Sequence, residues 1–181
     1  MVKGSVKINN KLLHREEEKK EIIQSIYCND ITLISGKSGC GKTHLILDMM
    51  LNRENVLSEY VLLCIKNKNQ NLFNDLQKYL KKGKKYIILI DDINNINDMD
   101  QILYYLNPTS GFELKIIATV RDYARNKVID KISDFENTTN NLFSIGNIFI
   151  KQLTDEQLKD IIINNTKIKQ ELIIRNIIYV A

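Results

Sequence analysis

Chain-breaking residues are scarce in this sequence: proline occurs once and glycine seven times among 181 residues. Tryptophan is absent, and the three cysteines are odd in number and show no metal-ligand spacing. This cysteine pattern argues against a disulfide framework and fits a reducing, cytoplasmic location. Because glycines are few, the cluster Gly36, Gly39 and Gly41 carries more information than such a cluster usually does.

Long apolar runs and a strong excess of charge are also missing. No run approaches the ~20 apolar residues of a membrane-spanning helix, and no cleaved N-terminal signal is visible, so we expect a soluble protein without a membrane partner. The 26 basic and 22 acidic residues give a net charge of +4 spread along the chain, which is weak evidence for a nucleic-acid partner. A length of 181 residues with 44% hydrophobic residues suits one folded domain.

Apolar runs and amphipathic segments alternate along the chain. The predicted strands are 31–35, 60–65, 86–91, 114–120 and 148–153. The predicted helices are 14–27, 45–51, 69–82, 98–106, 128–132 and 154–164, the last with a capping box at Thr154 and Gln157. Alternating strands and helices require right-handed crossovers, and near-continuous apolar strands indicate burial on both faces. We therefore predict an α/β fold, with helices on both sides of a five-stranded, mostly parallel sheet.

A glycine-rich segment, GKSGCGKT, lies between the first predicted strand and the helix that follows it. It matches G-x-x-x-x-G-K-[ST], the P-loop pattern, at each fixed position. A phosphate chain is bound well by backbone N–H groups at the positive end of a helix dipole, and glycines let the backbone approach it closely. The residues predicted to bind the triphosphate are Gly36, Lys37, Ser38, Gly39, Cys40, Gly41, Lys42, Thr43 and His44.

Within this segment, Lys42 is expected to reach the β- and γ-phosphates as a mobile cation. The hydroxyl of Thr43 is expected to bind Mg²⁺, while His44 is expected to pack on the helix that follows the loop. The alternative interpretation is a chance glycine turn before a helix. The strand and helix that flank the segment favour the P-loop.

Two carboxylates, Asp91 and Asp92, end the predicted strand at 86–91. The preceding aliphatic run and this acidic pair resemble a Walker B element. One strand and one helix fit between Lys42 and Asp91, so Asp91 can end a strand beside the P-loop strand. We predict that Asp91 binds Mg²⁺ or its water and that Asp92 is catalytic, orienting the attacking water. The alternative is an Asp-rich turn that closes a core strand.

The predicted strand at 114–120 ends in Thr119 and Arg121. Both side chains are predicted to be catalytic and to face the γ-phosphate, where a guanidinium stabilises negative charge or reports its loss. A strand that ends in a surface arginine is the alternative interpretation.

Taken together, ISGKSGCGKT, YIILIDD and KIIATVRDYAR resemble the nucleotide-binding domain of the STAND class of P-loop ATPases, close to the AAA+ group. The resemblance covers roughly His14 to Asn164 and implies a three-layer αβα P-loop NTPase domain that binds ATP with Mg²⁺. In that class the arginine equivalent to Arg121 senses the γ-phosphate. An Arg-Glu segment that borders the adenine precedes the P-loop in many such ATPases, which places His14 to Glu16 near the base.

The resemblance also implies a division of the chain and a function. We expect an N-terminal arm and lead-in helix (1–30), a P-loop NTPase core (31–153) and the start of a helical lid (154–181), the last truncated. The expected function is a slow ATPase switch in signalling or defence that self-associates or acts on other domains of a longer chain. Alternatives are an AAA+ ATPase that loads or remodels DNA and, less favoured because Asp92 beside Asp91 suits water activation, a P-loop kinase.

Overall fold

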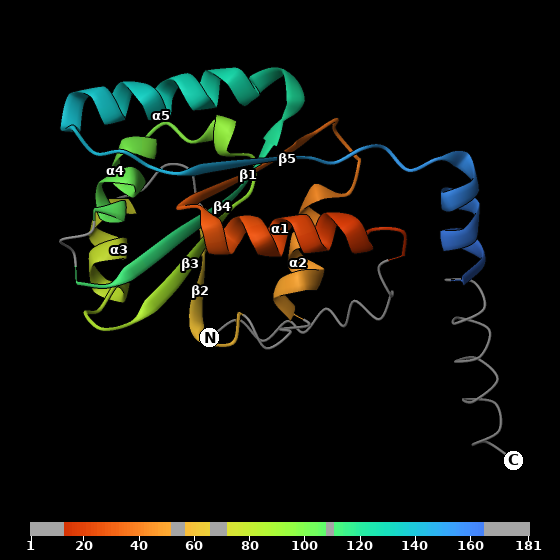
Figure 1. Ribbon diagram of the computed structural model, residues 1–181, viewed down its shortest axis with the longest axis horizontal. Coiled ribbons are helices and arrows are strands. Elements are labelled where there is room, and N and C mark those ends of the chain that lie inside the picture. The colour runs from red at the N-terminus through yellow and green to blue at the C-terminus, as the bar shows by residue number, and fades with distance from the viewer. Residues whose placement is uncertain (1–12, 52–56, 66–71, 108–110, 165–181) are drawn as a thin grey trace, which may run out of the picture.

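Five parallel strands form the centre of the molecule (Figure 1). The computed structural model describes residues 13–51, 57–65, 72–107 and 111–164. The strands are β1 (Ile31–Gly36), β2 (Tyr60–Ile65), β3 (Lys85–Ile90), β4 (Glu113–Arg121) and β5 (Ile145–Phe149). They lie in the order β2-β3-β4-β1-β5, and every pairing between neighbours is parallel. The predicted five-stranded parallel sheet is confirmed.

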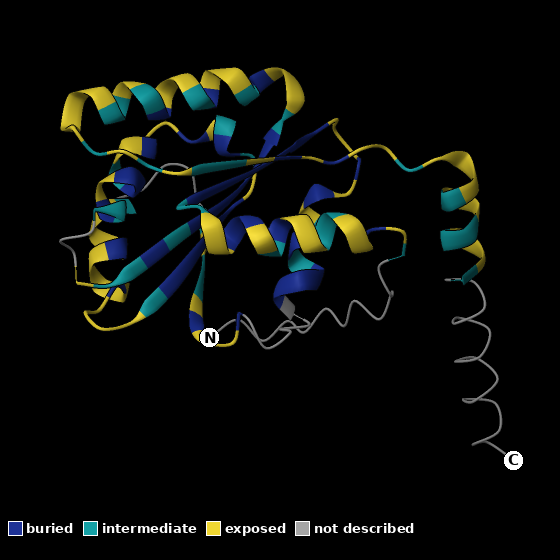
Figure 2. Cartoon of the chain, viewed as in Figure 1, coloured by how far each residue is buried: buried dark blue, intermediate teal, exposed yellow. Residues whose placement is uncertain are grey.

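The central strands are buried on both faces, as the dark blue strands in Figure 2 show. Successive side chains of a strand point to opposite faces, so an aliphatic run supplies both sides of the sheet with apolar contacts. Leu33 and Ile88 belong to the core on one face, and Ile34 and Ile87 belong to the core on the other. This double burial explains why β1, β3 and β4 read as nearly unbroken apolar runs.

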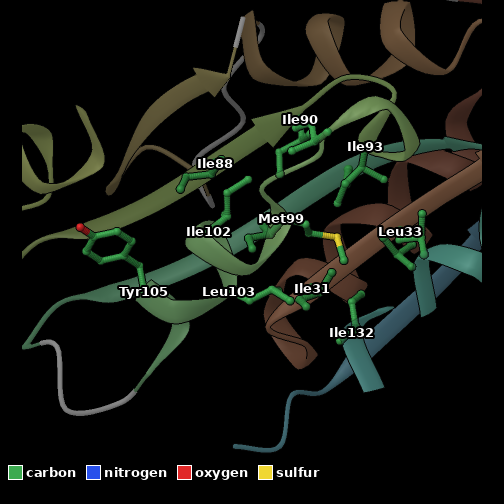
Figure 3. Packing of buried hydrophobic residues seen from close by; sticks show 14 of the residues in the cluster. Ile31, Leu33, Ile88, Ile90, Ile93, Met99, Ile102, Leu103, Tyr105 and Ile132 are labelled. Carbon is green, nitrogen blue, oxygen red and sulfur yellow. The ribbon is translucent and has the colours of Figure 1, made fainter. Parts of the chain in front are cut away.

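Helices cover both faces of the sheet and complete three layers. One face carries α1 (Glu16–Cys28) and α2 (Lys42–Leu51), and the other carries α3 (Leu72–Tyr79), α4 (Met99–Leu103) and α5 (Arg125–Thr139). Short 3-10 helices are η1 (Ile93–Asn95), η2 (Tyr104–Leu106) and η4 (Asp122–Ala124). Figure 3 shows the core on the second face, where Ile102 of α4 and Ile132 of α5 belong to the same cluster as Ile31 of β1. The predicted α/β class is confirmed.

Several of the predicted elements have wrong boundaries, most clearly the fifth strand and the helix at 128–132. The fifth strand, predicted at 148–153, is β5 at Ile145–Phe149, because its pairing with β1 ends at Phe149. As an edge strand it buries only Ile148, so its apolar pattern is weak. The helix predicted at 128–132 extends over all of α5. Only Val128 and Ile132, one turn apart, are buried in it, and its many polar residues concealed its length.

A further helix spans 155–164 and lies beyond the end of the sheet (Figure 1). The N–H of Gln157 donates to Thr154 Oγ1 at 3.3 Å, and Gln157 Oε1 accepts from the N–H of Thr154 at 2.9 Å. These contacts confirm the capping box. The expected N-terminal arm at 1–12 and the chain after 164 lie outside the described residues, and the division into arm, core and lid stays a prediction. None of the described helices has the length and apolar character needed to cross a bilayer.

Candidate functional site

The carboxyl ends of β1, β3 and β4 meet at one edge of the sheet. Since β4 lies between the other two, its register pairs Gly36 of β1 with Arg121 and Ile90 of β3 with Ala118. Asp91, which follows Ile90, is therefore brought beside the segment that follows Gly36. This edge is where parallel α/β sheets bind ligands.

The glycine-rich segment connects β1 to α2, as the sequence predicts. At Gly36, φ is 156°, and a Cβ atom would lie 2.6 Å from the carbonyl oxygen of Ile150 and 2.9 Å from Sγ of Cys40. A backbone atom only 2.6 Å away could not move aside without a large cost in free energy, so this position requires glycine. Gly41 has a φ of 91°, in the left-handed region that glycine adopts at little cost. The curl of the loop thus depends directly on these glycines.

Lys42, the first residue of α2, lies folded over the loop. Its Nζ donates to the carbonyl oxygens of Gly36 at 2.8 Å and Lys37 at 2.9 Å, and the residue is only 8% exposed. An ammonium group held inside a curl of backbone is a fixed positive charge for an anionic ligand. Since α2 begins here, the positive end of its dipole adds to that charge.

The two predicted Mg²⁺ ligands contact each other. Thr43 Oγ1 donates to Asp91 Oδ1 at 2.7 Å, which joins the P-loop to the end of β3. Thr119 Oγ1 donates to the same oxygen at 2.7 Å and accepts from the N–H of Asp92, also at 2.7 Å. Thr119 thus fixes both the side chain of Asp91 and the backbone of Asp92, which has a left-handed φ of 51°.

Arg121 lies at the open side of this network. Its Nη2 is 3.6 Å from Asp92 Oδ2, and its Nη1 donates to the hydroxyl of Tyr123 at 3.5 Å. The hydrogen bond to Tyr123 and the charge of Asp92 raise the pKa of Arg121 above its usual value. Both members of the pair are partly exposed, so the ion pair is screened by solvent.

A cavity of about 330 Å³ opens over these groups. It is lined by Ser38, Gly39, Gly41, Lys42, Thr43, His44, Asp91, Asp92 and Arg121. Every lining residue was singled out from the sequence. Thr119 does not line the cavity and is 1% exposed. Its hydroxyl is bonded to Asp91 and Asp92 and does not face the cavity. The catalytic and metal-binding roles assigned from the sequence stay predictions.

Arg15 belongs to the site's surroundings in a way that sequence reasoning missed. The resemblance placed His14 to Glu16 near the base, and that placement stays a prediction. Arg15 is 4% exposed and lies against the P-loop itself. Its Nη2 donates to the carbonyl oxygen of Cys40 at 3.0 Å, and Glu18 accepts from its Nη1. The sequence shows only an arginine that precedes an acidic run. That pattern does not reveal that its partner is Cys40, 25 positions along the chain.

Comparison with protein-family models and with curated proteins gives no match. Among solved structures, the chain is similar to a Walker-type ATPase of Pyrococcus abyssi, with a TM-score of 0.53 and 14% identity over 88% of this chain and 59% of that one. It is also similar to the S. cerevisiae Hsp104–ADP complex, with a TM-score of 0.55 and 15% identity over 82% of this chain and 28% of that one. The chain therefore spans less than two thirds of each. At such identities the likeness shows the fold alone, a parallel α/β sheet with helices on both faces.

Proposed function

We propose that this chain binds ATP with Mg²⁺ at the P-loop and hydrolyses it slowly as a regulatory switch. The observation that carries the proposal is the 2.7 Å contact between Thr43 Oγ1 and Asp91 Oδ1. These atoms belong to two motifs that are separated by 48 positions and that the sequence assigns to the same ion. The likeness to a Walker-type ATPase and to an ADP complex supports the same nucleotide class.

The residues present fit a magnesium ion. A hydroxyl and a carboxylate are hard oxygen ligands, and Mg²⁺ in phosphate sites is usually bound by one or two protein oxygens together with water and phosphate. The described residues contain no cluster of three or more acidic, histidine or cysteine ligands, and such a site needs none. Thr43 and Asp91 would hold the ion, which neutralises charge on the β- and γ-phosphate oxygens when bound.

Asp92 and Arg121 supply the groups for hydrolysis. In the proposed reaction a water oxygen bonds to the γ-phosphorus as the bond to the β–γ bridging oxygen breaks, which yields ADP and inorganic phosphate. Asp92 orients that water and accepts its proton, and Arg121 stabilises charge on the γ-phosphate. Thr119 acts through Asp91 and Asp92, so we assign it a positioning role in place of the direct contact expected from the sequence.

Titration with fluorescent ATP tests the binding step. Lys42→Ala should weaken affinity by about 10- to 100-fold, because it removes a charge-assisted contact worth roughly 1.5–3 kcal/mol. Lys20→Ala is the matched control, since it removes the same charge from an exposed position on α1. Equal affinity of the Lys42→Ala variant and the wild type would refute nucleotide binding at this loop.

The switch role rests on the resemblance to STAND proteins and needs its own test. Phosphate release and light-scattering mass should be measured with ATP, with ADP and without nucleotide. A switch that self-associates should show slow turnover and a larger mass with ATP than with ADP. Where this chain acts on other domains of a longer protein, ATP should instead change its affinity for them. Fast turnover with no effect of ATP on mass or on such binding would contradict the switch.

A second candidate function, an AAA+ type ATPase acting on DNA, is favoured by one surface at the opposite end of β3. Lys81, Lys82 and Lys84 are exposed there and have no ion-pair partner among the residues that the structure describes. Tyr79, the last residue of α3 and two positions before Lys81, is 65% exposed. An exposed aromatic ring beside lysines suits a stacked base and phosphates. Hydrolysis stimulated by single-stranded DNA, and lost in a triple alanine variant of these lysines, would favour this function.

A further inference from the structure

Arg15 connects two segments that lie far apart in the sequence. A single amino group, Nη2, donates to the carbonyl oxygen of Cys40 in the P-loop at 3.0 Å and to the carbonyl oxygen of Lys151 at 2.8 Å. Lys151 lies between β5 and the helix at 155–164. Arg15 is 4% exposed, so its guanidinium is shielded from solvent and water competes little for these hydrogen bonds.

The segment after β5 also contacts the P-loop directly. The N–H of Ile150 donates to the carbonyl oxygen of Ser35 at 2.8 Å, and the carbonyl oxygen of Ile150 lies 2.6 Å from where a Cβ on Gly36 would be. Next to Arg15, His14 Nε2 is 2.7 Å from Asp160 Oδ2 of the helix at 155–164. Residues 14 and 15 therefore contact both the P-loop and the helix at 155–164.

The contact with Cys40 fixes the direction of a backbone amide in the loop. The structure contains no cis peptide among the described residues, and in a planar trans peptide the C=O and the following N–H point in opposite directions. Because the Cys40 carbonyl points to Arg15, the N–H of Gly41 points away from it. Gly41 lines the cavity of the site, so its amide is a candidate donor to an anion bound there.

We propose that Arg15 is a positioning residue that orients the Gly41 amide and couples the state of the P-loop to the helix at 155–164. A phosphate that draws the Gly41 amide tilts the same peptide plane and hence the Cys40 carbonyl. Arg15 transmits this change to the Lys151 carbonyl, because one nitrogen holds both oxygens. The coupling rests on the proposed binding of ATP at the loop, whereas the link between loop and helix exists without ligand.

Hydrogen exchange without nucleotide tests that link. Arg15→Ala should raise exchange several-fold in both 37–43 and 151–164. Arg15→Lys, which keeps the charge but lacks the forked nitrogen geometry, should do so to a smaller extent and covers the case in which the alanine variant does not fold. Lys19→Ala is the matched control, because Lys19 pairs with Asp48 of α2 at 2.8 Å from the same helix. Exchange in 151–164 that stays at the wild-type level in the folded Arg15 variants overturns the proposal.

Exchange at saturating ATP separates the coupling from binding itself. In the wild type and in Lys19→Ala, ATP should slow exchange in 155–164 at least twofold. In the Arg15 variants, ATP should still bind, with lower affinity, and leave that exchange unchanged. A full ATP effect in these variants overturns the coupling. A wild type that binds no ATP refutes the proposed function, and in that case the measurement without nucleotide still decides whether Arg15 links loop and helix.

Discussion

Thr119→Val removes one hydroxyl from the candidate site and leaves the volume of the side chain nearly unchanged. Thr119 is 1% exposed, and its Oγ1 makes two hydrogen bonds of 2.7 Å, to Asp91 Oδ1 and from the N–H of Asp92. Valine supports neither bond. The variant therefore leaves the Asp92 amide without its acceptor and Asp91 with one donor fewer.

The size of the effect follows from what each partner retains. The hydrogen bond of the Asp92 amide is part-buried, and an amide left without its acceptor costs about 1–3 kcal/mol. Asp91 is exposed and keeps its bond from Thr43, so it adds little to that cost. We expect Thr119→Val to lower the free energy of unfolding by about 1–3 kcal/mol. Thr119→Ser keeps the hydroxyl and loses one methyl group, which costs about 1 kcal/mol.

Urea unfolding followed by circular dichroism measures the difference, with an expected stability order of wild type, serine variant and valine variant. Turnover measured by phosphate release should fall more in the valine variant than its ATP affinity does, since the hydroxyl positions the acidic pair without touching the loop. A valine variant within about 0.5 kcal/mol of the wild type, a difference typical of neutral surface changes, would refute the reasoning. So would a serine variant at least as unstable as the valine variant.

Three further predictions follow from the same geometry. Gly36→Ala places a Cβ 2.6 Å from the carbonyl oxygen of Ile150, so thermal unfolding should show a loss of about 1–3 kcal/mol, and an unchanged midpoint would contradict the tight approach. Asp92→Asn should lower turnover by about 10²- to 10⁴-fold at nearly constant ATP affinity, and wild-type phosphate release would exclude Asp92 as the base. Burial, followed by the hydrogen bond to Glu113, raises the pKa of Tyr60. The folded chain therefore keeps this proton where the unfolded chain loses it, and stability should fall as pH rises above about 10. Tyr60→Phe should reduce that alkaline slope, and equal slopes in urea titrations would contradict the assignment.

The sequence predicts which residues meet at this edge of the sheet where short-range spacing and the sheet topology agree. The P-loop is recognisable because its glycines, Lys42 and Thr43 are fixed by the backbone of one short turn. Asp91 is predictable because it directly follows an aliphatic run that marks a buried strand. Parallel strands have their carboxyl ends at the same edge of a sheet. These local rules were enough to identify every residue that lines the cavity.

Contacts set by tertiary packing were not predictable in the same way. The partners of Arg15 lie 25 and 136 positions along the chain, and no local pattern specifies them. The hydroxyl of Thr119 was expected to face the γ-phosphate, but the sequence does not show that a backbone amide and a carboxylate would both take it as a partner. The strand at Ile145–Phe149 was displaced in the prediction because an edge strand carries little apolar signal.

The site consists of a rigid part and an exchangeable part, and this division suits a response to the γ-phosphate. Lys42 and Thr119 are buried, and their bonds are 2.7 to 2.9 Å long. Asp92 and Arg121 are partly exposed and pair at 3.6 Å, a contact that solvent screens and that a ligand can replace at low cost. A γ-phosphate that attracts Arg121 frees the Asp92 carboxylate at the same time. In the proposed ATPase, one weak ion pair would therefore link detection of the third phosphate to the group that activates water.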